Sequence, residues 1–146
     1  MIYGNDRTKL RQVFLDTWLK YQNQQPLEPL EEQLAALLVE HPEYHALLNQ
    51  PAAVEKDFHI DPGRDNPFLH LAMHLSIREQ VALDRPKGIE ECYITICKIT
   101  GNHEAEHRMM AILGQALWQA QRNGAAPDEL EYLRQLQRAA QSDTRR

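Results

Sequence analysis

The segment at residues 66–83, NPFLHLAMHLSIREQVAL, constrains the fold more than any other stretch of the sequence. Asn66 is a favoured helix N-cap and Pro67 suits the first helical position, so we expect a helix to begin here. Apolar residues then occur on every face as far as Leu83, which is typical of a helix buried among other helices. The segment therefore predicts a central buried helix with other elements packed around it.

Helical periodicity extends through most of the remaining chain. Proline, glycine and asparagine positions divide it into further helices at residues 5–23, 29–41, 42–49, 103–123 and 127–140. Residues 89–100 carry a β-branched run that would also suit a strand, but no second strand candidate exists to pair with it, so we expect a helix. The predicted fold class is all-α: an irregular up-and-down helical bundle of about six helices around residues 66–83.

Length, composition and net charge limit the classes of protein to which this chain can belong. A chain of 146 residues with 42% hydrophobic and 25% charged residues fits a single helical domain, residues 1–146, with a frayed tail at 141–146. The net charge of −5 argues against nucleic acid as a partner, and no apolar run reaches the length of a membrane span. The N-terminus lacks a secretory pattern, so we expect a cytoplasmic protein. A homo-oligomer, a protein partner and a small-molecule substrate are all compatible with the sequence.

Histidine is the unusual feature of the composition. Of the 7 histidines, all but one fall into three pairs spaced i,i+4: His41/His45, His70/His74 and His103/His107. Random placement would give about 0.3 such pairs. An i,i+4 pair on a helix presents both imidazoles to one side, and neutral imidazole is a common ligand of transition metals. The remaining histidine, His59, falls in residues 51–65, which we expect to form a surface connection.

The sequence therefore predicts a transition-metal site inside the bundle. The candidate ligands are His70, His74, His103 and His107, with His45 as a fifth. A nitrogen-rich set without thiolate suits Zn, Fe, Mn or Ni. His41 falls at the edge of its helix, so it does not share a clean face with His45. Glu104 and Glu106 flank the second pair, where either is a candidate ligand, base or hydrogen-bond partner. Cys92 and Cys97 fit reduced, structural thiols.

Two alternatives to a metal-binding bundle stay open. In the first, the protein is a non-catalytic interaction or assembly protein whose histidines are hydrogen-bonded in the core. In the second, residues 103–107 (HEAEH) are the HExxH motif of a zinc hydrolase, with Glu104 activating water. That motif opens a helix here instead of lying within one, and the following residues supply no obvious third ligand. Whether the protein is an enzyme is not decided by the sequence.

Four segments carry a resemblance to a known family: HPEYHALL at 41–48, NPFLHLAMHLSIREQ at 66–80, DRPKGI at 84–89 and ALWQAQRNG at 116–124. They resemble an uncharacterised bacterial family, domain-of-unknown-function family 1841, over almost the whole chain. The resemblance implies a small stand-alone cytoplasmic protein and implies no activity. More loosely, the HxxxH spacing in a helical bundle is similar to hemerythrin-like and DinB-like metal-binding bundles.

Overall fold

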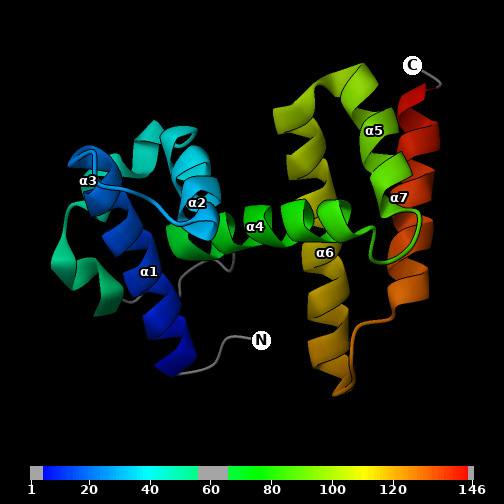
Figure 1. Cartoon of the computed structure of the whole chain (residues 1–146). Helices are drawn as coiled ribbons and strands as arrows, with labels where there is room; N and C mark the ends of the chain where they lie inside the picture. Colours follow the sequence, from blue (N-terminus) through cyan, green and yellow to red (C-terminus); the bar gives the residue numbers. More distant parts are fainter. Residues whose placement is uncertain (1–4, 56–65, 145–146) are drawn as a thin grey trace. The chain divides into compact units, whose positions relative to one another are not determined.

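The computed structural model describes residues 5–55 and 66–144, and all the regular structure within them is helical (Figure 1). Seven α-helices and two 3-10 helices follow one another as α1 (Asn5–Gln22), α2 (Pro29–Val39), η1 (Pro42–Tyr44), α3 (His45–Leu48), η2 (Pro51–Glu55), α4 (Pro67–Leu83), α5 (Ile89–Thr100), α6 (Asn102–Asn123) and α7 (Glu129–Thr144). The predicted all-α class is confirmed, and the ambiguous residues 89–100 form helix α5.

The chain divides into two compact units, an N-terminal unit (Met1–Ala72) and a C-terminal unit (Met73–Arg146). The division falls inside α4, so this helix contributes residues to both units. The sequence predicted one domain, and the cooperativity of unfolding would test that prediction.

The core of the N-terminal unit is built from α1, α2 and the short helices that follow them. Its larger buried apolar side chains are Phe14, Leu15, Trp18, Leu34, Leu37, Leu38, Leu48, Val54, Phe68 and Leu71. Phe14 stacks on Phe68 with ring centroids 6.3 Å apart. Arg11 donates a hydrogen bond from Nη1 to the Val54 carbonyl over 3.1 Å, which ties α1 to η2.

The short helix η2 corrects one prediction. Its Ala53 and Val54 are 2% and 6% exposed and pack into the core, whereas Pro51, Ala52 and Glu55 are exposed, so residues 51–55 are only partly a surface connection. A short apolar stretch in a 3-10 turn buries side chains that a solvated loop would leave in water. Residues 56–65, which include His59, lie outside the described residues.

The core of the C-terminal unit lies between α5, α6, α7 and the end of α4. α5 packs against both α6 and α7, and the buried cluster comprises Ile77, Ile89, Cys92, Ile96, Ala105, Met109, Met110, Leu113, Tyr132, Leu136 and Ala140. On α5 the three buried positions, Ile89, Cys92 and Ile96, are spaced three and four residues apart. This is the stripe of an amphipathic helix, which explains why its β-branched residues are compatible with a helix.

Helix α4 begins as predicted but is buried on one side only. The Leu69 amide donates to Asn66 Oδ1 over 3.1 Å, which confirms Asn66 as the N-cap. Its fully buried positions include Leu71, His74 and Ile77, which recur every three residues. Leu69 and Leu83, on other faces, are 39% and 57% exposed. The helix is therefore half-buried, because its neighbours within each unit cover a single stripe.

Several helix ends differ by a few residues from those predicted. α6 has Gly101 as its N-cap residue and begins at Asn102, one residue before the predicted start at residue 103. α7 continues past Ala140, where the frayed tail was expected, and reaches Thr144. Residues 141–144 contain neither glycine nor proline, so nothing in the sequence stops the helix there. No described helix is both long enough and apolar enough to cross a membrane.

Candidate metal centre

His74 is the buried centre of a histidine group in the C-terminal unit. Its side chain is fully buried in the stripe of α4 that faces the core. Its Nδ1 donates a hydrogen bond to Glu106 Oε1 on α6, and its Nε2 lies 3.2 Å from His107 Nε2. Because a carboxylate can only accept, the hydrogen of the neutral His74 ring is on Nδ1. Its Nε2 therefore presents a lone pair toward His107.

Glu106 holds this arrangement in place. Only 5% of the residue is exposed, and Arg78 Nε donates to the same carboxylate oxygen over 3.0 Å. Burial raises the pKa of the Glu106 carboxyl, but the hydrogen bond from His74 and the charge of Arg78 outweigh that effect, and the pKa lies below its ordinary value. Glu106 is therefore a buried carboxylate that accepts from two side chains of α4.

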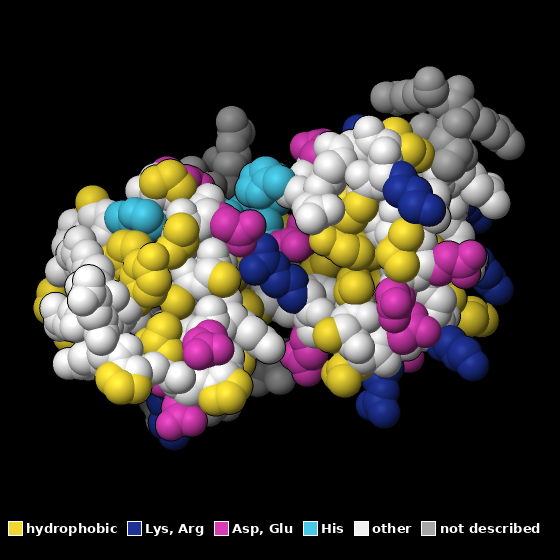
Figure 2. Space-filling view, turned by 45° about the horizontal axis from the view of Figure 1, so that its top comes forward, with side chains coloured by type: hydrophobic (Ala, Val, Ile, Leu, Met, Phe, Trp, Pro, Cys, Tyr) yellow, Lys and Arg dark blue, Asp and Glu magenta, His cyan; other side chains and the backbone are white. Residues whose placement is uncertain are grey.

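His103 completes the group within this unit. It is the second residue of α6, and its ring centroid lies 4.2 Å from that of His107 and 6.1 Å from that of His74. His103 is exposed, whereas His107 is partly buried. Figure 2 shows histidine side chains in cyan at the molecular surface. Three of the predicted ligands thus come together in the C-terminal unit, at a point that solvent reaches from the His103 side.

His41 and His70 form a similar pair in the N-terminal unit. Their rings meet edge to face with centroids 5.3 Å apart, and each offers a ring nitrogen within 4.8 Å of the other. His41 is 2% exposed, and its Nδ1 donates to the Leu37 carbonyl over 2.9 Å. The hydrogen bond fixes His41 as the Nδ1–H tautomer when the ring is neutral, so its Nε2 is the ligand atom.

His45 is held by different contacts. Its Nε2 donates to the Leu38 carbonyl over 2.8 Å, and its ring stacks on Trp18 with centroids 4.2 Å apart. These contacts engage one of the two ring nitrogens and fix the plane of the ring. The role of His45 as a fifth ligand stays a prediction.

Glu104, which a zinc hydrolase of the HExxH type would use as its base, points elsewhere. Its carboxylate pairs with Arg108 Nε over 3.3 Å, one turn further along α6, and its side chain is 54% exposed. Glu106, the other acidic residue of the motif, points inward to His74 instead. The two flanking glutamates therefore have opposite environments, which their symmetrical spacing in the sequence did not indicate.

Sequence reasoning missed two residues of these groups. Arg78 follows His74 by one helical turn, so the i,i+4 rule could have placed it on the same face of α4. His41 was not among the predicted ligands because it falls at the edge of its helix, and its ring packs against His70 and Tyr44 in the N-terminal unit. No spacing rule predicts that contact, because residue 41 lies outside the regular helix.

Taken together, the described residues define an all-helical protein with paired, oriented imidazoles, a class of site that can hold a metal ion. A sequence model of the family described as a domain of unknown function (DUF1841) matches residues 6–138. The chain belongs to this family, which confirms the resemblance carried by the four segments. Searches for similar curated proteins and similar solved structures find no match, and the likeness to hemerythrin-like and DinB-like bundles is not confirmed.

Proposed function

We propose that the protein binds a transition-metal ion, and that His74 and His107 are its principal ligands in the C-terminal unit. The observation that carries this proposal is the 3.2 Å separation of their Nε2 atoms. A tetrahedral ion with metal–nitrogen bonds of about 2.0–2.1 Å keeps its ligand nitrogens about 3.3 Å apart. The two imidazoles are therefore already spaced as two ligands of one ion.

The surroundings of His74 support the same proposal. A histidine that binds a metal commonly donates its other ring N–H to a carboxylate, which orients the ring and makes the ligand nitrogen more basic. Glu106 is that carboxylate for His74, and Arg78 balances its charge. Such a chain of contacts keeps the ligand nitrogen aimed at one point before any ion arrives.

Further ligands come from the residues that the sequence singled out. His103 lies beside His107 and is the natural third ligand in the C-terminal unit. His41 and His70 are a separate candidate pair within the N-terminal unit, and His45 is the remaining candidate there. Nitrogen ligands with a nearby carboxylate fit Zn, Fe, Mn or Ni, and the site does not select among these metals.

Elemental analysis of the untagged protein, followed by titration of the chelator-treated protein with Zn²⁺, tests the proposal. We expect bound metal in the purified protein and its loss in a His74→Ala/His107→Ala variant. A Glu106→Gln variant should bind metal about 10–100-fold more weakly, since it keeps both ligands and loses the orienting charge. A His41→Ala/His70→Ala variant measures the share of the N-terminal pair, and His45→Ala that of the fifth candidate.

A second candidate function rests on the same contact. His107 Nε2–H can donate to His74 Nε2 at this distance, in which case the histidines only hold the core of an interaction or assembly protein. On that account the protein takes up none of Zn, Fe, Mn or Ni, and His74→Ala/His107→Ala changes the free energy of unfolding alone. Metal lost equally from every histidine variant would contradict the assignment to His74 and His107.

A further inference from the structure

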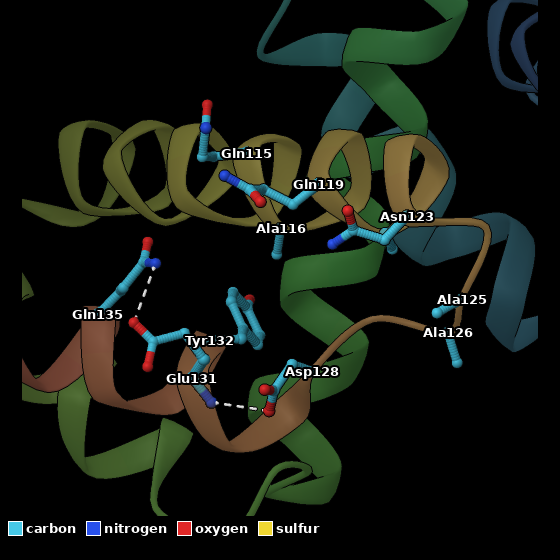
Figure 3. A pocket seen from close by; sticks show the side chains of 11 residues that line it. Gln115, Ala116, Gln119, Asn123, Ala125, Ala126, Asp128, Glu131, Tyr132 and Gln135 are labelled. Atoms are coloured by element: carbon cyan, nitrogen blue, oxygen red, sulfur yellow. Dashed lines mark hydrogen bonds between the residues drawn. The ribbon is translucent and has the colours of Figure 1, made fainter.

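A second concave site in the C-terminal unit uses none of the histidines. It is a cavity of about 360 Å³ between the end of α6 and the start of α7 (Figure 3). Its first α6 residue, Gln115, follows His107 by about two turns, or about 12 Å along the helix. The cavity is therefore separate from the histidine group.

Four amide side chains are among the polar residues that line this cavity. They are Gln115, Gln119 and Asn123 on α6 and Gln135 on α7. The three on α6 are four residues apart, so they form a row along one face of that helix. Figure 3 shows the two helices lining opposite sides of the cavity. Each amide offers a carbonyl oxygen as acceptor and an NH₂ group as donor, and the row can serve a ligand at several points along its length.

The charge of the lining is negative. Asp128 and Glu131 line the cavity, and no lysine, arginine or histidine does so among the described residues. Asp128 Oδ1 accepts from the Glu131 amide over 3.1 Å, as the cap of α7. Glu131 also pairs with Arg134 over 3.4 Å, but both side chains are well exposed, at 40% and 57%. Such surface pairs are weak, so the carboxylate can still attract a cation.

The apolar part of the lining suits a methylene chain. Four alanines face the cavity: Ala116, Ala120, Ala125 and Ala126. The ring of Tyr132 lies between the helices, is 5% exposed and is anchored by a hydrogen bond from its hydroxyl to Gln80 Oε1 over 2.7 Å. Methyl groups and an aromatic face together favour contact with CH₂ groups, and the ring also attracts a cation.

We propose that this cavity binds a linear aliphatic diamine, with its ammonium groups on the carboxylates and amide oxygens and its methylene chain on the alanines and Tyr132. A primary ammonium has three donors and no acceptor, which matches a lining rich in oxygen and devoid of basic residues. The carboxylates of Asp128 and Glu131 repel an anion, so we expect no anionic ligand to bind in this cavity. A neutral diol of the same length gains the apolar contacts but not the charge interaction.

Isothermal titration of the full-length, metal-free protein with 1,4-diaminobutane at about 0.15 M salt tests this proposal. We expect a dissociation constant below about 1 mM, with no measurable binding of 1,4-butanediol or succinate. An Asp128→Asn/Glu131→Gln variant should bind the diamine at least about tenfold more weakly. Asparagine is itself a good N-cap, so this variant keeps the start of α7. Far-UV circular dichroism verifies that it is folded.

A Glu32→Gln/Glu90→Gln variant is the matched control, because it removes the same charge at exposed positions outside the cavity. It should bind the diamine as the original protein does. Equal weakening in both variants would mean that the diamine is attracted by the net negative charge of the chain, and the proposal would be wrong. Absence of diamine binding, or equal binding of the diol, would overturn it too. None of these outcomes depends on the histidine pairs.

Discussion

Glu106 is the residue on which the histidine group of the C-terminal unit depends. It accepts hydrogen bonds from His74 and Arg78 while nearly all of its surface is buried. A buried carboxylate is costly unless hydrogen-bond donors and a positive charge satisfy it, and here the His74 ring N–H and the Arg78 guanidinium of α4 do so. The contact could not be predicted from the sequence, because His74 and Glu106 are 32 residues apart. Their meeting depends on how α6 packs against α4, which no local pattern encodes.

We expect Glu106→Gln to lower the free energy of unfolding of the metal-free protein by about 1–3 kcal/mol at neutral pH, since it replaces charge-assisted hydrogen bonds with neutral ones. The pKa of Glu106 in the folded protein lies below the ordinary value of 4.5. Its stabilising contribution is therefore complete above that value and is lost as pH falls through the folded pKa. The difference between the two proteins should shrink over this acid range in urea titrations.

Glu104→Gln provides the control for this measurement. Glu104 belongs to the same turn of α6, but its side chain is 54% exposed, and it pairs with Arg108, whose side chain is 35% exposed. Surface pairs contribute between about 0 and 1 kcal/mol, so this variant should unfold almost as the original protein does at every pH. If Glu104→Gln and Glu106→Gln had the same effect, the buried hydrogen bonds of Glu106 would not be stabilising the unit.

At the scale of the element, the sequence predicted well those helix boundaries that a capping side chain or a glycine defines. Asn66 caps α4, as predicted. Gly124 caps the end of α6 in a left-handed conformation with φ 61° and ψ 32°, directly after the predicted end of this helix at residue 123. The Ala125 amide donates to the Ala120 carbonyl over 3.0 Å, which closes the last turn of α6. The end of α7 was harder to predict, because residues 141–144 neither favour nor stop a helix.

Replacing Gly124 with alanine should reduce the free energy of unfolding by about 1 kcal/mol, because only glycine adopts this backbone conformation without strain. No atom lies within 4 Å of the Cβ that alanine would add, so the loss comes from the backbone alone. Gly124→Asn should lose less, since asparagine tolerates the left-handed region. Thermal unfolding of the three proteins measures this order, and an equal loss for alanine and asparagine would contradict the explanation.

At the scale of the whole molecule, the single domain expected from the sequence stays a prediction, and the contacts divide the chain into two compact units at a point within α4. The sequence shows no linker there, because residues 66–83 form one uninterrupted helix. Apolar patterning reveals which faces of a helix are buried, but it does not reveal which of several cores each face enters. That is why α4 could be predicted as a helix and its division between two units could not.

The two tryptophans test whether these units unfold together. Trp18 is buried in the N-terminal unit, and Trp118 is half-exposed in the C-terminal unit, with Arg122 over its ring. Trp18→Phe and Trp118→Phe variants each leave one fluorescent reporter. We expect fluorescence and far-UV circular dichroism to give coincident urea transitions in both variants, because α4 supplies buried residues to both cores. Separate midpoints for the two reporters would instead establish two domains.

The rate at which Cys92 is alkylated reports how often the C-terminal core opens. Its sulfur is packed in the stripe of α5 that faces the core, and burial raises the pKa of its thiol. A buried, protonated thiol does not react with an alkylating reagent until the surrounding helices separate. Cys97, one turn further along α5 and partly exposed, supplies an internal reference within the same helix. The lag between the two alkylation events, followed by mass spectrometry, measures how often this core opens under native conditions.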